Sequence, residues 1–478
     1  MKFNKLPSLT LVAASLALSF AAMGSAQAAA KVVINNLNAP GVGFNDPTPA
    51  TPVGGNTGTT IGQQRLIAFT HAANIWGATL TSSVPIVVNA QFTPLACTAT
   101  SAVLGSAGAT QVFADFPGAP KAGTVYSYAL ANKLYGSEIS DNPGAQINAR
   151  FNSDLGKANC LAGSSFYLGL DANEGSNIDF VATLLHEMGH GLGFQTFTNG
   201  ATGAQFAGYP SAWDHYLLDN TTGKLWVDMT NAERAASALK PSGLSWTGPR
   251  VTAAVPSVLT ATAELRVVGA GANSPSGDLY AVGEADFGPK LDQSPLTGQV
   301  AQVALQADSP GSACTPFNAA NAEAVRNKIA LVNRGTCGFV VKVKNAQNAG
   351  ATGVIVADNA PGAVTGLGGA DPSITIPAVR VSQADGVQLA ASLTRANGNT
   401  NGTVAKLQRS RSSLSGADAQ RRITMFTPNP YQPGSSVSHY NTSATRNQLM
   451  EPAISADLTH SVTAPTDLTF ELFKDIGW

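Results

Sequence analysis

The chain has 478 residues, which is more than one hydrophobic core usually supports, so the sequence predicts two or more domains. Its formal net charge of -1 gives no electrostatic reason to expect a nucleic-acid partner or an anionic membrane surface. Charged residues make up 12% of the chain, below the roughly 25% of an average protein, which predicts loop-rich structure with weak surface electrostatics.

Residues 1–30 have the pattern of a cleaved export signal. Lys2 and Lys5 precede an apolar run that extends to Phe20, and Ala26–Ala28 has the small residues of a cleavage site. The run is short for a bilayer span, and no later stretch is long and apolar enough to cross a membrane. We therefore expect a mature protein that is secreted or periplasmic, with no stable membrane insertion.

Residues 31–260 are expected to form the first part of a catalytic domain. Val84–Val88 reads as a strand, and an amphipathic pattern near residue 180 predicts a helix. Ser176 or Asn177 is expected to cap the start of this helix. The helix is expected to end soon after His190, at two glycines, Gly191 and Gly193.

This helix carries the sequence His186-Glu187-Met188-Gly189-His190. Residues four apart share one helix face, so His186 and His190 can reach a single metal ion. Zinc held by neutral imidazoles lowers the pKa of a bound water to about 7 and polarises a neighbouring carbonyl. Glu187 fits the general base that takes the proton of this water. The sequence thus predicts a zinc site whose third ligand comes from elsewhere.

Three residues compete for the place of third ligand. His215 follows His190 most closely and could fold back, although the residues around it are typical of a core. Glu233 would suit an arrangement in which a downstream helix supplies a glutamate, but its setting is typical of a capped surface helix. His439 lies far downstream, and an inserted module accounts for much of that separation. We expect His439 to be the ligand.

Residues 265–405 follow a different sequence pattern, in which short apolar runs alternate with helical patterns. The expected elements are a strand at Lys328–Val332, a helix at Phe339–Ala349, a strand at Gly353–Ala357, a strand at Ile374–Val381 and a helix capped by Ser382 that runs through Leu389. This alternation predicts a small α/β unit with a parallel pair of strands.

The same region resembles the protease-associated domain. The matching residues are Ala330–Phe339, Lys342, Ala349–Ala351 and Ile376–Val379. The resemblance implies a module without catalytic residues that binds peptide, covers an active site or contacts partners.

The helical motif up to Phe194, together with His439 and Met450, resembles the leishmanolysin-type metzincins. The resemblance implies that His186, His190 and His439 bind zinc and that Met450 forms a turn beneath the metal. Residues 406–478 would then return the third ligand to the catalytic domain.

Two residues depart from the metzincin pattern. Thr196 stands where the commoner metzincins have their third histidine, which excludes that compact version. Tyr440 stands where the leishmanolysin type has tryptophan.

The resulting fold class is α+β, with a metzincin-like zinc peptidase catalytic domain interrupted by a small α/β protease-associated domain. The expected function is that of a secreted zinc-dependent metalloendopeptidase acting on protein or peptide substrates. Two alternatives stay open: an exported, zinc-stabilised binding or adhesion module without catalysis, and a zinc amidase acting on cell-wall peptides. The presence of Glu187 argues against the non-catalytic alternative, because a structural zinc site needs no base.

Four cysteines in an exported chain predict disulfides, for which three pairings exist. We expect Cys97 to pair with Cys160 and Cys314 with Cys337, because each bridge then stays inside one predicted domain.

The sequence contains three further candidate sites, namely one oxygen-rich cluster and two isolated histidines. Asp171, Asn173, Glu174 and Asp179 form an oxygen-rich cluster, for which the incomplete spacing favours a solvated loop over a calcium site. His71 and His460 are expected to be ordinary structural or surface residues.

Overall fold

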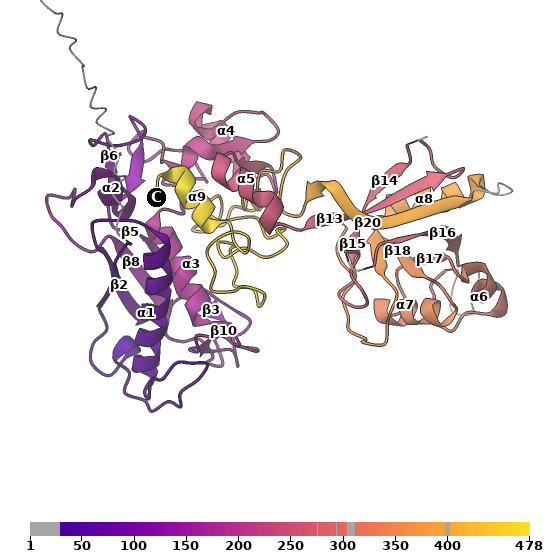
Figure 1. Cartoon of the computed structure of the whole chain (residues 1–478), viewed down its shortest axis with the longest axis horizontal. Coiled ribbons are helices and arrows are strands. Elements are labelled where there is room, and N and C mark those ends of the chain that lie inside the picture. Colours follow the sequence, from indigo (N-terminus) through magenta and orange to yellow (C-terminus); the bar gives the residue numbers. More distant parts are fainter. Residues whose placement is uncertain (1–28, 275, 293, 304–310, 363, 397–401) are drawn as a thin grey trace, which may run out of the picture.

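The computed structural model describes residues 29–274, 276–292, 294–303, 311–362, 364–396 and 402–478. The predicted export signal lies almost wholly outside this part of the chain. The described residues form two bodies joined by strands β13 (Ala261–Gly269) and β20 (Thr403–Leu414), as Figure 1 shows. One hydrophobic core draws on residues 30–259 and 423–476, whereas two others lie within residues 265–407.

The larger body is built from a four-stranded sheet and the helices that cover it. The main elements are β1 (Val32–Asn36), α1 (Ile61–Thr79), β2 (Ile86–Thr93), β5 (Gly105–Ala109), α2 (Tyr128–Tyr135), β8 (Ile147–Asn152), α3 (Phe180–Leu192), α4 (Asn231–Ser237), α5 (Pro249–Val258) and α9 (Thr469–Ile476). The short strands are β3 (Cys97–Thr98), β4 (Ser101–Ala102), β6 (Val112–Ala114), β7 (Val125–Ser127), β9 (Phe166–Tyr167), β10 (Ile178–Asp179), β11 (Leu217–Asp219) and β12 (Leu244–Trp246). Three short 3-10 helices are η1 (Gly43–Asn45), η2 (Trp213–Tyr216) and η3 (Trp226–Asp228).

The strands of this sheet lie in the order β1-β2-β8-β5. The first three are parallel, and β5 runs antiparallel to β8 at the edge. Alternate residues of β2 are buried, which is typical of a sheet with one covered face. On the other face, the side chains of Asn35, Asn89 and Asn148 form hydrogen bonds from strand to strand. The sheet therefore offers one apolar face to the helices and ends at β5.

Helix α3 is buried along its whole length. The indole N–H of Trp76 on α1 donates to the carbonyl of Leu185, which fastens the two helices together. A Cβ built at Gly191 would lie 2.3 Å from Cγ2 of Ile147, so only glycine allows α3 to approach β8 this closely.

The start of α3 differs from the sequence prediction, and its end agrees with the prediction at one of the two expected glycines, Gly193. The N-cap is Asp179, whose carboxylate accepts the N–H of Ala182, rather than Ser176 or Asn177. The helix also continues through Gly191 to Leu192 and ends at Gly193, where φ is 126°. Gly191 serves close packing against β8 and does not end the helix.

The smaller body contains an eight-stranded sheet with helices on both faces. Besides β13 and β20, its elements are β14 (Asp278–Ala281), β15 (Gly283–Glu284), β16 (Leu296–Gln302), α6 (Ala319–Val325), β17 (Ile329–Asn333), α7 (Phe339–Asn348), β18 (Gly353–Ala357), β19 (Ala378–Val381) and α8 (Gln383–Arg395). The strand order is β14-β13-β20-β16-β17-β18-β19-β15.

The elements predicted within this region are present, although β19 begins only at Ala378 and α8 continues beyond Leu389 to Arg395. β17 and β18 form a parallel pair, and β19 lies parallel to β18. Helix α7 packs on one face of the sheet through Val343 and Ala346, and α8 packs on the other through Leu389. Ser382 caps α8 by accepting the N–H of Asp385.

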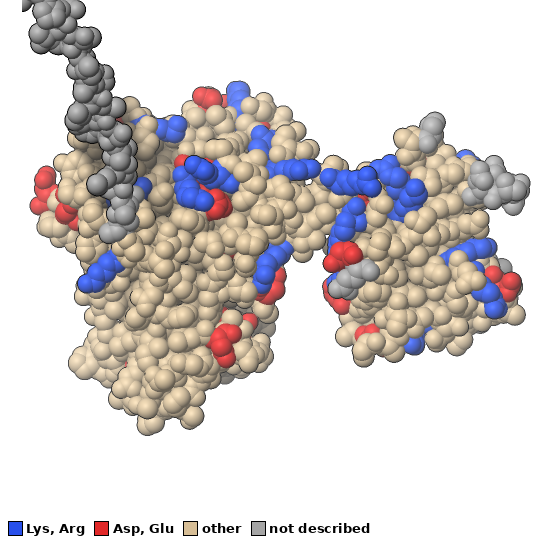
Figure 2. All heavy atoms as spheres, viewed as in Figure 1, with Lys and Arg blue, Asp and Glu red and all other residues tan. Residues whose placement is uncertain are grey.

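The charges are unevenly distributed over the visible surface. In Figure 2 the larger body is mostly uncharged, while Lys and Arg side chains gather near the junction of the two bodies. None of the helices in the described part of the chain has the length and apolarity needed to span a bilayer.

Candidate metal centre

Three histidines from distant parts of the chain meet in the larger body. Among the described residues, His186, His190 and His439 form the one group of three or more His, Cys, Asp or Glu side chains close enough to share a metal ion. His186 and His190 project from α3, and His439 lies on the segment that follows the return from the smaller body. The Nε2 atom of His190 lies 3.1 Å from those of His186 and His439, which are 3.2 Å from each other.

The other ring nitrogen of each histidine lies against a backbone carbonyl. Nδ1 of His186 lies 2.7 Å from the oxygen of Leu449, while those of His190 and His439 lie 2.8 Å from the oxygens of Phe194 and Ser435. Because a carbonyl oxygen only accepts, each Nδ1 must carry a hydrogen and donate it. In the neutral rings, each Nε2 therefore presents a lone pair.

Burial keeps all three rings neutral. It lowers the pKa of His186 to about 4 and that of His190 to about 3, and it lowers the pKa of His439 well below its usual value. The mutual repulsion of the histidines acts in the same direction at His190 and His439.

This arrangement fits a divalent cation. Three lone pairs converge within 3.1–3.2 Å, and none of the three nitrogens has a hydrogen to donate to the others. A tetrahedral zinc ion with bonds of 2.0–2.1 Å separates its nitrogen ligands by about 3.3 Å. The carbonyls that hold each Nδ1 are the partners that orient imidazole ligands in zinc proteins.

Glu187 lies beside the three histidines and is 6% exposed. Burial raises the pKa of its carboxyl group to about 8, and a hydrogen bond from the backbone N–H of Ala107 on β5 opposes that rise. A general base must be deprotonated before it can accept a proton, and a cation held by the neighbouring histidines would favour that form of the carboxyl group.

Met450 packs beneath α3. The side chain is fully buried, and a Cβ built at Gly189 would lie 2.8 Å from its sulfur atom. Its carbonyl accepts the N–H of Tyr440, which joins this turn to the segment that carries His439. Met450 thus lies directly under the stretch of helix between the two histidines.

The histidines and Glu187 open into a cleft of about 740 Å³. Its walls come from the edge strand β5 and the segment before it, from α3 and the residues after it, and from residues 431–439 and 452–454. Among its lining residues, the ionisable side chains are Glu187, the three histidines and Tyr431. The remaining lining side chains are apolar, hydroxyl-bearing or, at Gln195, an amide.

The other two candidate ligands lie elsewhere. Nε2 of His215 lies 2.9 Å from the hydroxyl of Thr124. Glu233 belongs to the capping box of α4 and forms an ion pair with Lys224 on the surface. Neither residue belongs to the cluster of three histidines.

Two of the acidic residues in the oxygen-rich cluster, Asp171 and Asp179, have protein partners. Asp171 accepts the hydroxyl of Tyr167, and Asp179 accepts both the N–H of Ala182 and a ring nitrogen of His460. His460 is therefore part of the structure that holds the start of α3, a role that no sequence pattern indicated. His71 packs edge-on against its ring.

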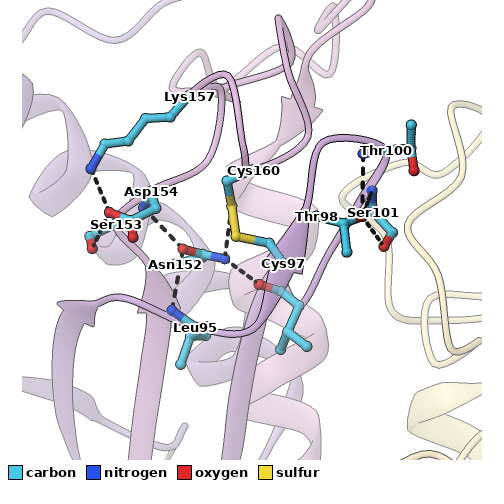
Figure 3. The surroundings of a disulfide bond; sticks show 11 residues. Leu95, Cys97, Thr98, Thr100, Ser101, Asn152, Ser153, Asp154, Lys157 and Cys160 are labelled. Carbon is cyan, nitrogen blue, oxygen red and sulfur yellow. Dashed lines mark hydrogen bonds and ion pairs between the residues drawn. A yellow bond between two sulfur atoms is a disulfide. The ribbon is translucent and has the colours of Figure 1, made fainter.

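Both predicted disulfides are confirmed, Cys97 with Cys160 and Cys314 with Cys337. The first lies near the mouth of the cleft, because Leu161 and the segment from Ser101 to Ala107 line the cleft. Figure 3 shows Asn152 beside this bridge, where its amide accepts the N–H of Asp154 and donates to the carbonyl of Val103. The bridge thus joins β3, which precedes one cleft-lining segment, to the loop after β8, in which Leu161 lines the cleft.

Comparison with known proteins identifies one part of the chain. Residues 296–389 match the PA domain family, within the smaller body. Leucine aminopeptidase 2 of Arthroderma otae is 35% identical over 102 residues, which cover 21% of this chain and 20% of that protein. A receptor homology region, transmembrane domain- and RING domain-containing protein 1 of Oryza sativa subsp. japonica is 36% identical over 104 residues, covering 22% and 19%. ER degradation-enhancing alpha-mannosidase-like protein 3 of Homo sapiens is 43% identical over 85 residues, covering 18% and 8%.

The chain spans about a fifth or less of the length of these relatives, and their names describe very different proteins. Two solved structures also overlap in part. An aminopeptidase from Aneurinibacillus sp. strain AM-1 shares 24% identity at a TM-score of 0.24, covering 32% of this chain and 31% of that one. BSAP, a zinc aminopeptidase from Bacillus subtilis, shares 21% identity at a TM-score of 0.21, covering 33% and 35%. Scores this low support no statement on fold or activity. The protein therefore contains a PA domain at residues 296–389, inside a longer chain.

Proposed function

We propose that the protein is an exported zinc-dependent endopeptidase of the leishmanolysin type. The observation that carries the proposal is the convergence of three imidazole lone pairs beside the carboxyl group of Glu187, in an open cleft. The two disulfides support export, because such bridges persist in oxidising compartments.

His186, His190 and His439 would hold the zinc ion through Nε2. When bound, zinc supplies a water of lowered pKa and polarises the carbonyl of the peptide bond. Glu187 takes a proton from the attacking water and returns it to the leaving amine. The carbonyls of Leu449, Phe194 and Ser435 keep the three rings in the tautomer that this requires.

The position of strand β5 favours a peptide as the substrate. It is the last strand of its sheet, and its residues Gly105 to Ala107 line the cleft, so the outer side of this part of the strand faces the place where a substrate would lie. An extended peptide binds to such a sheet edge through main-chain hydrogen bonds, whatever its side chains.

The composition of the cleft favours an endopeptidase over an exopeptidase. An aminopeptidase needs a carboxylate for the terminal ammonium group, and a carboxypeptidase needs Arg or Lys for the terminal carboxylate. The lining residues include no Lys, Arg or Asp, and Glu187, the one carboxylate among them, is assigned to the chemistry.

The test is to measure zinc content and cleavage of a quenched peptide with both termini blocked. We expect one zinc per chain and cleavage that stops with a chelator and returns with zinc. Glu187→Gln should keep the zinc and lose about 10²–10⁴-fold in rate. Unchanged cleavage by Glu187→Gln would refute the mechanism. Cleavage of aminoacyl substrates with a free amine, but not of the blocked peptide, would refute endopeptidase action.

A further inference from the structure

The edge strand β5 passes unusually close to Glu187. A Cβ built at Gly105 would lie 2.7 Å from Oε1 of Glu187, 2.8 Å from its Cγ and 2.9 Å from its Cδ. Non-bonded carbon atoms prefer separations of 3.5–4.0 Å, so a side chain at residue 105 overlaps three atoms of the glutamate. Because Cγ is close to the helix, the overlap is not relieved by turning the carboxyl group alone.

Glycine is needed at this position for space rather than for backbone conformation. Gly105 is not among the glycines of positive φ. It lies in a regular antiparallel pair with Phe151 of β8. An alanine could therefore adopt the same backbone, and the obstacle to it is the side chain of Glu187.

The same strand also holds the carboxyl group by a hydrogen bond. The N–H of Ala107, two residues after Gly105, donates to Glu187. The contact at Gly105 and the hydrogen bond at Ala107 thus act on one side chain from one strand.

We propose that Gly105 is a positioning residue for the general base. Its missing side chain allows β5 to lie in contact with Glu187, and this contact sets the place from which the carboxyl group reaches the attacking water. The proposal rests on the proposed function, in which Glu187 is the base.

The strand provides a matched control. A Cβ built at Gly108, three residues further along β5, has one neighbour within 4 Å, Oε1 of Gln195 at 3.6 Å, which is an ordinary contact. Gly108→Ala makes the same chemical change in the same strand without touching Glu187.

The first experiment is a double-mutant cycle in metal-free protein, followed by thermal unfolding. Overpacking should make Gly105→Ala lower the Tm by roughly 3–10 °C. In the Glu187→Ala background, the same change should lower the Tm by less than about 1 °C, because the overlapping atoms are gone. Gly108→Ala should have equal effects in both backgrounds. Equal effects of Gly105→Ala in both backgrounds would overturn the proposal.

The contact between Gly105 and Glu187 can be tested even if the Gly105→Ala variant does not fold. If Gly105→Ala does not accumulate but Gly105→Ala/Glu187→Ala does, the contact is supported. If neither accumulates, the strand itself rejects the side chain, and the proposal is overturned.

The second experiment compares zinc content and peptide cleavage. Gly105→Ala should bind one zinc per chain with an unchanged dissociation constant and KM, and its kcat should fall about 10–100-fold through misplacement of the base. Gly108→Ala should keep the wild-type kcat. Equal kcat for both variants, with an active wild type, would overturn the positioning role alone. A wild type without zinc-dependent cleavage would overturn the proposed function, whereas the metal-free cycle would still report the contact.

Discussion

Asp467 accepts the backbone N–H of Leu449 at 2.7 Å, and the carbonyl of that same leucine accepts the Nδ1 hydrogen of His186. The second oxygen of Asp467 accepts the N–H of Thr469, at the start of α9. The carboxylate, 3% exposed, thus connects the C-terminal helix to Leu449, the residue whose carbonyl orients the imidazole of His186 in the candidate metal centre. This connection acts through the backbone and involves no contact between Asp467 and the proposed metal.

We expect Asp467→Asn to weaken zinc binding. An amide retains one acceptor oxygen, so the Leu449 or the Thr469 hydrogen bond is lost and the carbonyl that holds His186 is less well placed. The zinc dissociation constant should rise about 10–100-fold, as for other residues that orient metal ligands. Competition with a chelating dye measures this dissociation constant.

The matched control is Asp475→Asn. Asp475 is also buried and accepts the N–H groups of Arg250 and Val251, but these lie away from the metal centre. Both variants should lose about 1–3 kcal/mol of stability, while only Asp467→Asn should change zinc affinity. Equal zinc affinities in the two variants would show that the Asp467 connection is purely structural.

His439→Ala should lose most of the bound zinc, because two imidazoles on one helix remain. His215→Ala is the control, since His215 contacts Thr124 and lies outside the histidine cluster. Measuring the zinc content of both variants after dialysis distinguishes the two candidate ligands. Full zinc occupancy in His439→Ala, with loss in His215→Ala, would reverse the assignment of the third ligand.

The two disulfides should differ in their effect on activity. Replacing Cys97 and Cys160 by Ala removes a bridge across 63 positions, worth about 4 kcal/mol in the chain-entropy description. Because this bridge joins two segments beside the cleft, we expect KM for the blocked peptide to rise. Replacing Cys314 and Cys337, which are 23 positions apart, should destabilise the smaller body and leave KM unchanged. A rise in KM in the second variant alone would contradict this assignment.

Glu451 should make the metal-free protein less stable as the pH rises. Burial raises its pKa to about 8 from the usual 4.5, so the folded state holds its proton more tightly than the unfolded state does. The stabilisation is complete below pH 4.5 and is lost as the pH rises through 8. Glu451→Gln keeps an acceptor for the N–H of Gln448, so it should flatten the fall in Tm between pH 5 and 8. Measuring both proteins in the Glu187→Gln background removes the similar contribution of Glu187, and parallel curves there would exclude Glu451 as the cause.

The sequence alone determined the local parts of the site. Two histidines four apart on an apolar helix must share a face, because the period of the helix places them there. The alternation of strands and helices between residues 328 and 395 and the pairing of the four cysteines were also predicted correctly. The helix and strand features depend on backbone geometry and on neighbours close in the sequence, whereas the cysteine pairing followed from the predicted domain boundaries.

Other parts of the site depend on packing between residues that are far apart in the sequence. The sequence favoured His439 over His215 and Glu233 as the third ligand because the expected insert explains its distance along the chain, and the structure brings His439 to the other two histidines across that insert of about 140 residues. Asp179 rather than Ser176 or Asn177 caps α3, and His460 from beyond the insert shares that carboxylate.

No sequence signal pointed to Gly105 or Asp467, because each matters only through a contact made after folding. A glycine in a strand and an aspartate before a helix are both common. The tertiary structure alone decides that Gly105 lies against Glu187 and that Asp467 accepts a hydrogen bond from Leu449, the residue whose carbonyl orients His186. A metal centre assembled from distant segments depends on how closely those segments pack, and the order of residues along the chain does not specify that distance.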